Sequence, residues 1–328
     1  MDAPQALQPD LFGPPGTDIR VVLAPPLPPV PPAPGRSRRG PKPTALSVCV
    51  LGSGSGGNAS VLRPPPGGGD RPVLIDAGFG PRTTTQRLAQ AGLTLAELGA
   101  VYVTHFDTDH FRPGWVRAMV DLKLKLRCHR WHLPDLRRVR DNQRLFAAGL
   151  VEPFDDTPFT ADGFAICPIR LQHDRQGTIG YRFTRGGVSL GYATDLGHAP
   201  EALCRHLAGV DVLCLESNYD ERMTKDSPRP AFVNRRNLSD SGHLSNDQAL
   251  AAVRRIGELS PHSNPRRVVL LHRSAQCNHP TKVRRCFAQD PAIARRVVLT
   301  DQRRRSRWIG VAPLRAVRRA QLTLAHCG

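Results

Sequence analysis

The segment with the clearest potential for chemistry is 104–110, which reads THFDTDH. Within six residues it holds four side chains that can bind metal ions: His105, Asp107, Asp109 and His110. These side chains converge on one point only if the segment folds as a tight loop. Imidazole and carboxylate are the ligands that zinc, manganese and iron accept in open hydrolytic sites. The segment therefore predicts a metal site, with a solvated acidic loop as the alternative.

Further residues of the same chemistry stand where apolar segments end. Asp76, His173, Asp195 and His272 each follow a run with the composition of a buried strand. In α/β proteins the loops at strand ends carry function, because the strands hold them rigidly while water and substrate still reach them. One metal pocket at the strand ends would account for all of these residues together.

The elements that would position these residues alternate along the chain. Residues 46–54, 72–78 and 99–105 are predicted to be strands, and 82–98 and 246–257 are predicted to be helices. Alternating strands and helices favour a layered α/β architecture. A chain of 328 residues is long enough for one large domain of this class with appendages.

The first 43 residues differ from the rest in composition. They contain 13 of the 31 prolines, so we expect an extended tail of residues 1–43 ahead of a folded domain of residues 44–328. The pentapeptide QPDLF, which begins at Gln8 and ends at Phe12, resembles the short peptides with which bacterial replication and repair proteins dock on the sliding clamp. The alternative is a stray apolar pair in a disordered arm.

The chain is strongly basic, with 46 Lys and Arg against 28 Asp and Glu, a net charge of +18. Such a charge attracts polyanions and predicts nucleic acid as a partner, although a GC-rich genome would also raise the arginine count. The C-terminal segment 301–328 holds seven arginines and one acid. Guanidinium groups suit phosphate, so this segment either follows a nucleic-acid backbone or is a solvated basic terminus.

Several classes of protein are disfavoured by what the sequence lacks. No apolar run approaches the 18 residues of a membrane span, and residues 1–15 do not have the pattern of a secretory signal, so we expect a cytoplasmic protein. The eight cysteines form no CxxC pair, which argues against zinc knuckles and a disulfide scaffold. The loop GSGSGGN lacks the GK[ST] ending of a P-loop, so we expect no nucleotide cofactor.

Taken in order, these residues resemble the metallo-β-lactamase superfamily, whose hallmark is HxHxDH followed by a distant His, an Asp and a last His. More narrowly, the chain is similar to the YycJ/WalJ-like branch of bacterial nucleases. That closer similarity rests on SGSGGN at 53–58, ESNYD at 216–220, GHLSN at 242–246, and LHRS at 271–274 followed by Cys277 and Asn278. The resemblance covers about residues 44 to 290 and implies a four-layer αββα sandwich.

The resemblance also implies two divalent metal ions, Zn²⁺, Mn²⁺ or Fe, and a set of ligands for them. One site would use His105, Asp107 and His173, the other Asp109, His110 and His272, with Asp195 as a bridge and Asp76 orienting a ligand histidine. The sequence departs from the family where Asp107 replaces the second histidine of the motif. A carboxylate still binds such ions, but it favours Mn²⁺ or Fe over Zn²⁺.

The activity that the resemblance implies is that of a metal-dependent phosphodiesterase acting on nucleic acid, and more finely a DNA exonuclease with a repair role. Metal-bound hydroxide would be the nucleophile, with Asp109 in the catalytic set. We expect His243 to contact the scissile phosphate or to assist the leaving group, unless it caps the helix that begins near Ser245. Ser55 and Asn58 are candidate substrate contacts, unless their loop is a plain tight turn.

Two other functions stay open at this point. The same fold hosts hydrolases of small esters, thioesters and lactones, because fold does not fix substrate. A non-catalytic nucleic-acid-binding protein, in which Asp107 marks a decayed site, is the alternative from another class.

Overall fold

The computed structural model describes residues 46–65, 69–260 and 265–311. The predicted tail at 1–43, with its clamp-like pentapeptide, and the arginines beyond residue 311 lie outside these ranges. No helix in the described ranges is both long enough and apolar enough to cross a bilayer.

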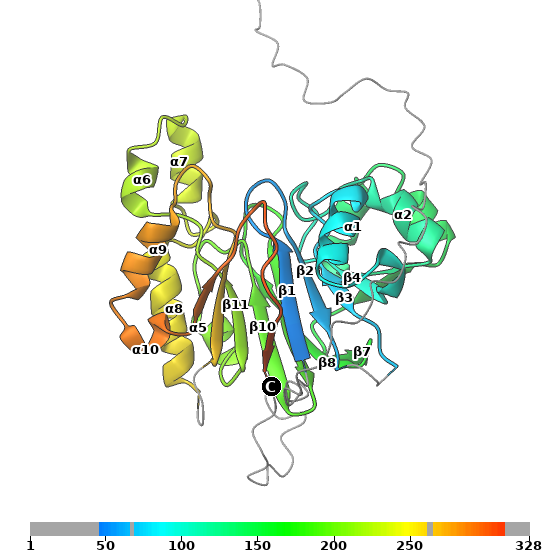
Figure 1. The fold of residues 1–328 in the computed structure, drawn as a ribbon. Helices are drawn as coiled ribbons and strands as arrows, with labels where there is room; N and C mark the ends of the chain where they lie inside the picture. The colour runs from blue at the N-terminus through cyan, green and yellow to red at the C-terminus, as the bar shows by residue number, and fades with distance from the viewer. Residues whose placement is uncertain (1–45, 66–68, 261–264, 312–328) are drawn as a thin grey trace, which may run out of the picture. The chain divides into compact units, whose positions relative to one another are not determined.

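Within the ranges that the structure describes, fourteen strands form two seven-stranded sheets (Figure 1). The strands of the first sheet are β1 (Leu46–Gly52), β2 (Ala59–Arg63), β3 (Val73–Ile75), β4 (Ala100–Tyr102), β5 (Lys125–His129), β6 (Val151–Phe154) and β14 (Ile309–Val311). Those of the second sheet are β7 (Phe159–Ala161), β8 (Phe164–Leu171), β9 (Thr178–Arg185), β10 (Val188–Ala193), β11 (Val212–Glu216), β12 (Arg267–Leu271) and β13 (Val297–Leu299).

The two sheets are built to the same plan. Their strand orders are β14-β1-β2-β3-β4-β5-β6 and β13-β12-β11-β10-β9-β8-β7. In the first sheet the strands pair antiparallel from β14 to β3 and parallel from β3 to β6. In the second they pair antiparallel from β7 to β10 and parallel from β10 to β13. Parallel strands end at the same edge of a sheet, so their loops gather there.

Helices cover the outer face of each sheet. Those beside the first sheet are α1 (Pro81–Gln90), α2 (Trp115–Leu122), α3 (Leu133–Leu136) and α4 (Gln143–Ala147), with the 3₁₀ turns η1 (Leu95–Glu97) and η2 (Arg130–His132). Those beside the second are α5 (Glu201–His206), α8 (Asn246–Glu258), α9 (Pro280–Phe287) and α10 (Pro291–Ala294). Two more helices, α6 (Glu221–Lys225) and α7 (Ala231–Asn237), stand apart from these layers at the upper left of Figure 1.

Three apolar clusters of described residues define the layers. One lies between the sheets, where Tyr102 of the first sheet meets the Phe183 ring of the second edge-on at 5.4 Å between ring centroids. The others lie between each sheet and its helices, and Trp115 and Phe287 are among their fully buried members. The predicted four-layer αββα sandwich is confirmed.

One predicted helix is shorter than expected. The helix predicted over 82–98 ends at Gln90, and the chain continues through Gly92, whose φ of +77° lies outside the helical region. Residues 95–97 then form a separate 3₁₀ turn, in which Thr94 and Glu97 make a capping box. Leu88 and Leu95 therefore belong to two separate elements that pack against the same apolar cluster.

The packing of α5 on the second sheet predicts a pH-dependent stability. His206 lies with its Nε2 3.1 Å from the Cys167 carbonyl, and burial together with the nearby Arg182 lowers its pKa to about 4. The unfolded chain takes up this proton near the ordinary pKa of about 6.5, so folding stability falls as the pH drops from there toward 4. Without metal, we expect His206→Gln to lose less stability over this range, measured by urea unfolding. Parallel pH profiles for the two proteins would contradict this expectation.

Candidate metal centre

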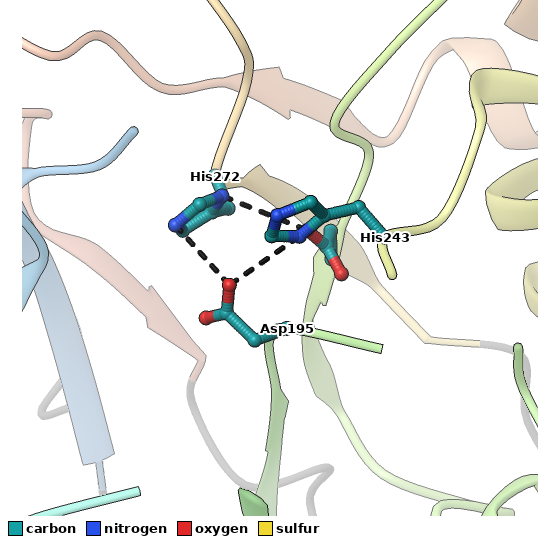
Figure 2. A group of neighbouring side chains, drawn as sticks. Asp195, His243 and His272 are labelled. Atoms are coloured by element: carbon teal, nitrogen blue, oxygen red, sulfur yellow. Dashed lines mark hydrogen bonds and ion pairs between the residues drawn. The ribbon is translucent and has the colours of Figure 1, made fainter. Parts of the chain in front are cut away.

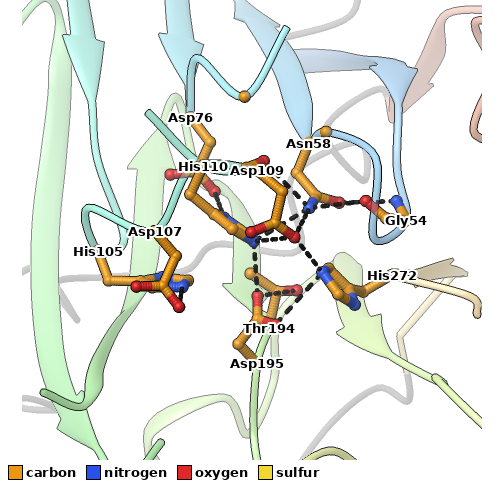
Figure 3. Close-up of polar contacts among 12 residues, drawn as sticks. Gly54, Asn58, Asp76, His105, Asp107, Asp109, His110, Thr194, Asp195 and His272 are labelled. Atoms are coloured by element: carbon orange, nitrogen blue, oxygen red, sulfur yellow. Dashed lines mark hydrogen bonds and ion pairs between the residues drawn. The ribbon is translucent and has the colours of Figure 1, made fainter. Parts of the chain in front are cut away.

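Three residues of the centre take an unusual backbone conformation directly after buried strands. Asp76 follows β3, Asp195 follows β10 within two residues, and His272 follows β12, with φ values of 60°, 57° and 52°. A side chain in this left-handed region costs of order 1–3 kcal/mol and persists only where the surroundings determine it. With this backbone conformation, all three side chains point toward the same space (Figure 3).

Backbone hydrogen bonds hold the predicted tight loop at 104–110, both within the loop and to neighbouring segments. Within the loop, the amide of His110 donates to the Asp107 carbonyl over 2.8 Å. Across the loop, the amide of Asn58 donates to the Asp109 carbonyl, and that of Ala77 donates to the His110 carbonyl, both over 2.7 Å. The ligand-bearing loop is thus fixed to the segments that follow β1 and β3.

The structure brings six of the seven predicted ligands together in two groups of three, and the seventh, Asp195, forms further groups with members of both. Within each group, one ligand atom of every member lies within 4.8 Å of those of the others. The groups are His105, Asp107 and His173, and Asp109, His110 and His272.

Asp195 lies between the two groups. Its Oδ2 is 2.9 Å from His110 Nε2, and its Oδ1 is 3.3 Å from His272 Nε2 and 3.9 Å from His173 Nε2. Asp195 is 2% exposed, whereas the Asp107 side chain at the rim is 41% exposed. One buried carboxylate therefore contacts both groups, which is the position predicted for a bridging ligand.

Hydrogen bonds to the other ring nitrogen orient three of the histidines. His110 Nδ1 lies 2.8 Å from Asp76 Oδ2, and His173 Nδ1 lies 3.0 Å from the Gly242 carbonyl. His105 Nδ1 lies 3.0 Å from the Thr104 hydroxyl, which also bonds to Asp76. Because these acceptors take the Nδ1 proton, the Nε2 lone pair is left to face the cluster, as in metal sites with a carboxylate behind the histidine.

The centre carries an excess of negative charge. Among the described residues, every ion pair of its five carboxylates is made with an imidazole, and none is made with Lys or Arg; the carboxylates are Asp76, Asp107, Asp109, Asp195 and Glu216. Burial opposes ionisation of Asp109, but His110 and His272 lower its pKa to about 2. These carboxylates call for cations that no Lys or Arg among the described residues supplies.

Without metal, protonated imidazoles supply that positive charge. Burial opposes the charged form of His272, but Asp195 and Asp109 raise its pKa to about 9. The pKa of His110 is also raised, because Asp195 and Asp76 favour its charged form although burial opposes it. His173 differs, because burial lowers its pKa to about 4 and leaves it neutral, the form in which imidazole binds metal.

The donor atoms and their spacing fit divalent metal ions. Two atoms that bind one ion at about 2.0–2.2 Å lie no more than about 4.4 Å apart. Asp109 Oδ2 is 3.2 Å from His272 Nε2 and 3.7 Å from His110 Nε2, and Asp107 Oδ2 is 3.6 Å from His105 Nε2. Buried imidazole and carboxylate are ligands that Zn²⁺, Mn²⁺ and Fe share, so the donor set is compatible with each of them.

Glu216, for which no role was predicted from the sequence, belongs to the centre, where it lies with Asp195, His243 and His272. Figure 2 shows how these last three side chains face one another. Glu216 is the last residue of β11 and is fully buried. Its Oε1 lies 2.7 Å from His243 Nδ1, and its Oε2 accepts from the Leu196 amide over 2.6 Å. A charged residue that closes an apolar strand, as in the run DVLCLE, is the signal that could have identified it.

His243 does not cap the helix that follows it. The cap of α8 is Ser245, whose hydroxyl accepts from the Gln248 amide in a capping box. The His243 ring is instead held by Glu216, lies 3.4 Å from Asp195 Oδ1 and remains 17% exposed. It is thus placed at the boundary between the buried ligands and solvent.

The two candidate substrate contacts lie in different surroundings. Asn58 is buried, and its amide group contacts the Ser53 hydroxyl, the Gly54 backbone and His110 Nε2, the last over 3.0 Å (Figure 3). Ser55 is exposed on the same loop. Asn58 therefore supports the ligand loop from within, and only Ser55 faces solvent.

Two glycines near the ligand loop offer a matched test of this geometry. A β-carbon at Gly78 would lie 1.7 Å from the Asp109 carbonyl oxygen, whereas at Gly80 it would meet nothing within 4 Å. We expect Gly78→Ala to displace Asp109 and to reduce bound metal per chain, with a loss of stability of at least about 1–3 kcal/mol. Gly80→Ala should retain the bound metal and the stability of the wild type. Metal content by mass spectrometry and urea unfolding measure these effects, and equal metal content in the two variants would refute the expectation.

Comparisons with known proteins agree with this geometry. The family model of the beta-lactamase superfamily domain matches residues 71–273, more than half of the chain. The exodeoxyribonuclease YycJ of Bacillus anthracis is 27% identical over 212 residues, which cover 63% of this chain and 76% of that protein. The exodeoxyribonuclease WalJ of Streptococcus pneumoniae is 26% identical over 236 residues, 70% of this chain and 82% of that protein.

Solved structures give the same fold. The metallo-β-lactamase fold protein YhfI from Bacillus subtilis superposes with a TM-score of 0.57 at 16% identity, over 80% of this chain and 98% of that one. The family match and the shared fold confirm the resemblance drawn from the sequence. The chain belongs to the beta-lactamase superfamily, has YycJ and WalJ among its relatives, and is a metal-dependent hydrolase.

Proposed function

We propose that the protein is a metal-dependent phosphodiesterase that hydrolyses nucleic acid, acting as a DNA exonuclease in repair. The observation that carries the proposal is the position of Asp195, which contacts both ligand groups and the exposed edge of the centre at His243. Two metal ions joined by one carboxylate are the arrangement of many enzymes that cleave phosphodiesters. The names of the relatives YycJ and WalJ support DNA as the substrate.

The seven ligands would hold two divalent ions, one in each group, with Asp195 shared between them. When bound, such ions activate water as a nucleophile and neutralise charge on the phosphodiester. We favour Mn²⁺ or Fe, because Asp107 adds an oxygen donor to its group. Asp76 and Thr104 have no contact with substrate in this scheme and keep His105 and His110 in place.

The protein itself would handle the leaving group through His243. Glu216 contacts Nδ1 of the ring, and no described residue forms a hydrogen bond with Nε2, so Nε2 can contact an oxygen of the substrate. Departure of a sugar alkoxide needs a proton, and a partly exposed imidazole beside a buried carboxylate can deliver one. In this scheme His243 contacts substrate, while Glu216 acts only by positioning His243.

The proposal is tested by assaying end-labelled single- and double-stranded DNA with Mn²⁺, Mg²⁺ or Zn²⁺. We expect metal-dependent release of nucleotides from an end, and a loss of at least about 100-fold in His110→Ala, since His110 contacts Asp195, Asp109 and Asp76. His206→Gln, which changes a histidine outside the centre, should retain activity. Rising salt should weaken cleavage steeply, because counterions compete for a polyanion.

Two results would overturn the proposal. Equal nuclease activity in wild type and His110→Ala would indicate a contaminating enzyme. Metal-dependent turnover of small esters or lactones that is insensitive to salt, with no cleavage of DNA or RNA, would favour the small-molecule hydrolase instead.

A comparison of leaving groups tests the role of His243. We expect His243→Ala to slow hydrolysis of DNA by about 10²–10⁴-fold, the usual contribution of a general acid. Hydrolysis of a p-nitrophenyl phosphodiester should fall much less, because p-nitrophenolate departs without a proton. Glu216→Gln should show the same pattern more weakly. An equal loss on both substrates, or a loss of bound metal in His243→Ala, would assign His243 to the ligands instead.

A further inference from the structure

The segment between β11 and α8 is not part of the sandwich. It contains α6 and α7 and stands clear of the four layers (Figure 1). Helix α7 has no buried residue, and its Phe232 is 66% exposed. The next most exposed large apolar side chains among the described residues, such as Phe146, are 39% exposed. Single exposed apolar side chains are common on protein surfaces, so the case for a binding surface rests on the position and the charge of this helix together with Phe232.

Both ends of this α6–α7 hairpin are attached to the metal centre. The chain enters it just after Asn218, whose amide contacts His272 Nδ1 over 2.8 Å. It returns through Gly242, whose carbonyl contacts His173 Nδ1, and through His243 itself. Arg236 of α7 also forms an ion pair with Asp174, the neighbour of His173. The hairpin is therefore fixed at the edge of the site where substrate would enter.

The hairpin is basic as well as aromatic. Residues 221–237 hold five Lys and Arg against two Asp and Glu. Arg229 donates to the Gln276 side chain, and Arg235 has no carboxylate within 4 Å among the described residues. A hollow of about 530 Å³ beside α6 is lined by Arg222, Lys282 and Asp226, and Arg222 forms an ion pair with Asp226, so the positive charge of the hairpin is carried mainly by α7. The charge suits the phosphates of a polyanion, and Phe232 suits the face of a base.

We propose that the α6–α7 hairpin docks a single-stranded segment of nucleic acid, with Phe232 stacked on an unpaired base and Arg235 on the phosphate backbone. This rests on the proposed function and deepens it by naming the form of substrate, since a base inside a duplex offers no free face to a side chain. The strand would pass from the hairpin to the metal centre past His243.

Binding and catalysis can be tested separately with Phe232→Ala, Phe232→Trp and the matched control Phe146→Ala on α4. A single-stranded oligonucleotide carrying 2-aminopurine, titrated in EDTA, reports stacking through fluorescence quenching. We expect Phe232→Ala to raise the Kd about 5- to 150-fold and to abolish the quenching, which corresponds to the stacking energy of one base. Phe232→Trp and Phe146→Ala should behave like wild type. Arg235→Gln should lower the slope of log K against log salt by about one.

Hydrolysis of bis(p-nitrophenyl) phosphate, which carries no base, should be unchanged in Phe232→Ala. If that variant binds and cleaves single strands like wild type, the docking inference is overturned and the proposed nuclease stands. If wild type hydrolyses bis(p-nitrophenyl) phosphate but neither binds nor cleaves nucleic acid, the proposed function fails together with the docking surface, and the hairpin is then a site for another class of partner.

Discussion

The structure of the centre depends on one buried carboxylate that cannot be left unpaired. Asp195 is 2% exposed and faces imidazoles from both ligand groups, and their positive charge lowers its pKa well below the ordinary range although burial opposes ionisation. An isolated carboxylate at this depth would be strongly unfavourable, so the surrounding histidines must stay close to it. Divalent ions would meet the same requirement with more charge, which explains why so many acids are gathered in one place.

The ligands come from both sheets, so the packing of the sandwich sets the geometry of the centre. The first sheet supplies the loop at 104–110 and Asp76 behind it, and the second supplies the residues after β8, β10 and β12, with Glu216 at the end of β11. The sheets are joined beside the centre, where the Tyr181 hydroxyl donates to the Val103 carbonyl and the Ile179 amide donates to that of Thr104. Bound metal would link the sheets further and so stabilise the folded state.

The sequence was sufficient to predict that these residues gather in one centre, because imidazole and carboxylate side chains recur at the ends of its apolar strands. Glu216 was not predicted as a member of the centre, because in the sequence it has the pattern of a polar residue that ends a strand. Its contact with His243 is visible only in the folded structure. Asn58 was expected at the substrate, but its role inside the loop depends on a contact with His110, which is distant in sequence. The exposure of Phe232 was equally hidden, since apolar residues in a short helix usually face a core.

The left-handed backbone at Asp76, Asp195 and His272 places conformational strain and function on the same positions. Glycine would relax the backbone there but would remove the side chain. No simple substitution at these three positions would therefore raise thermal stability and keep the centre. Lys123, at the C-terminus of α2, and Asp141 share this conformation, are exposed and lie outside the centre. Substitution of glycine at those two positions would therefore be the first choice for raising the thermal stability of this enzyme, because it would relieve backbone strain without removing a side chain of the metal centre.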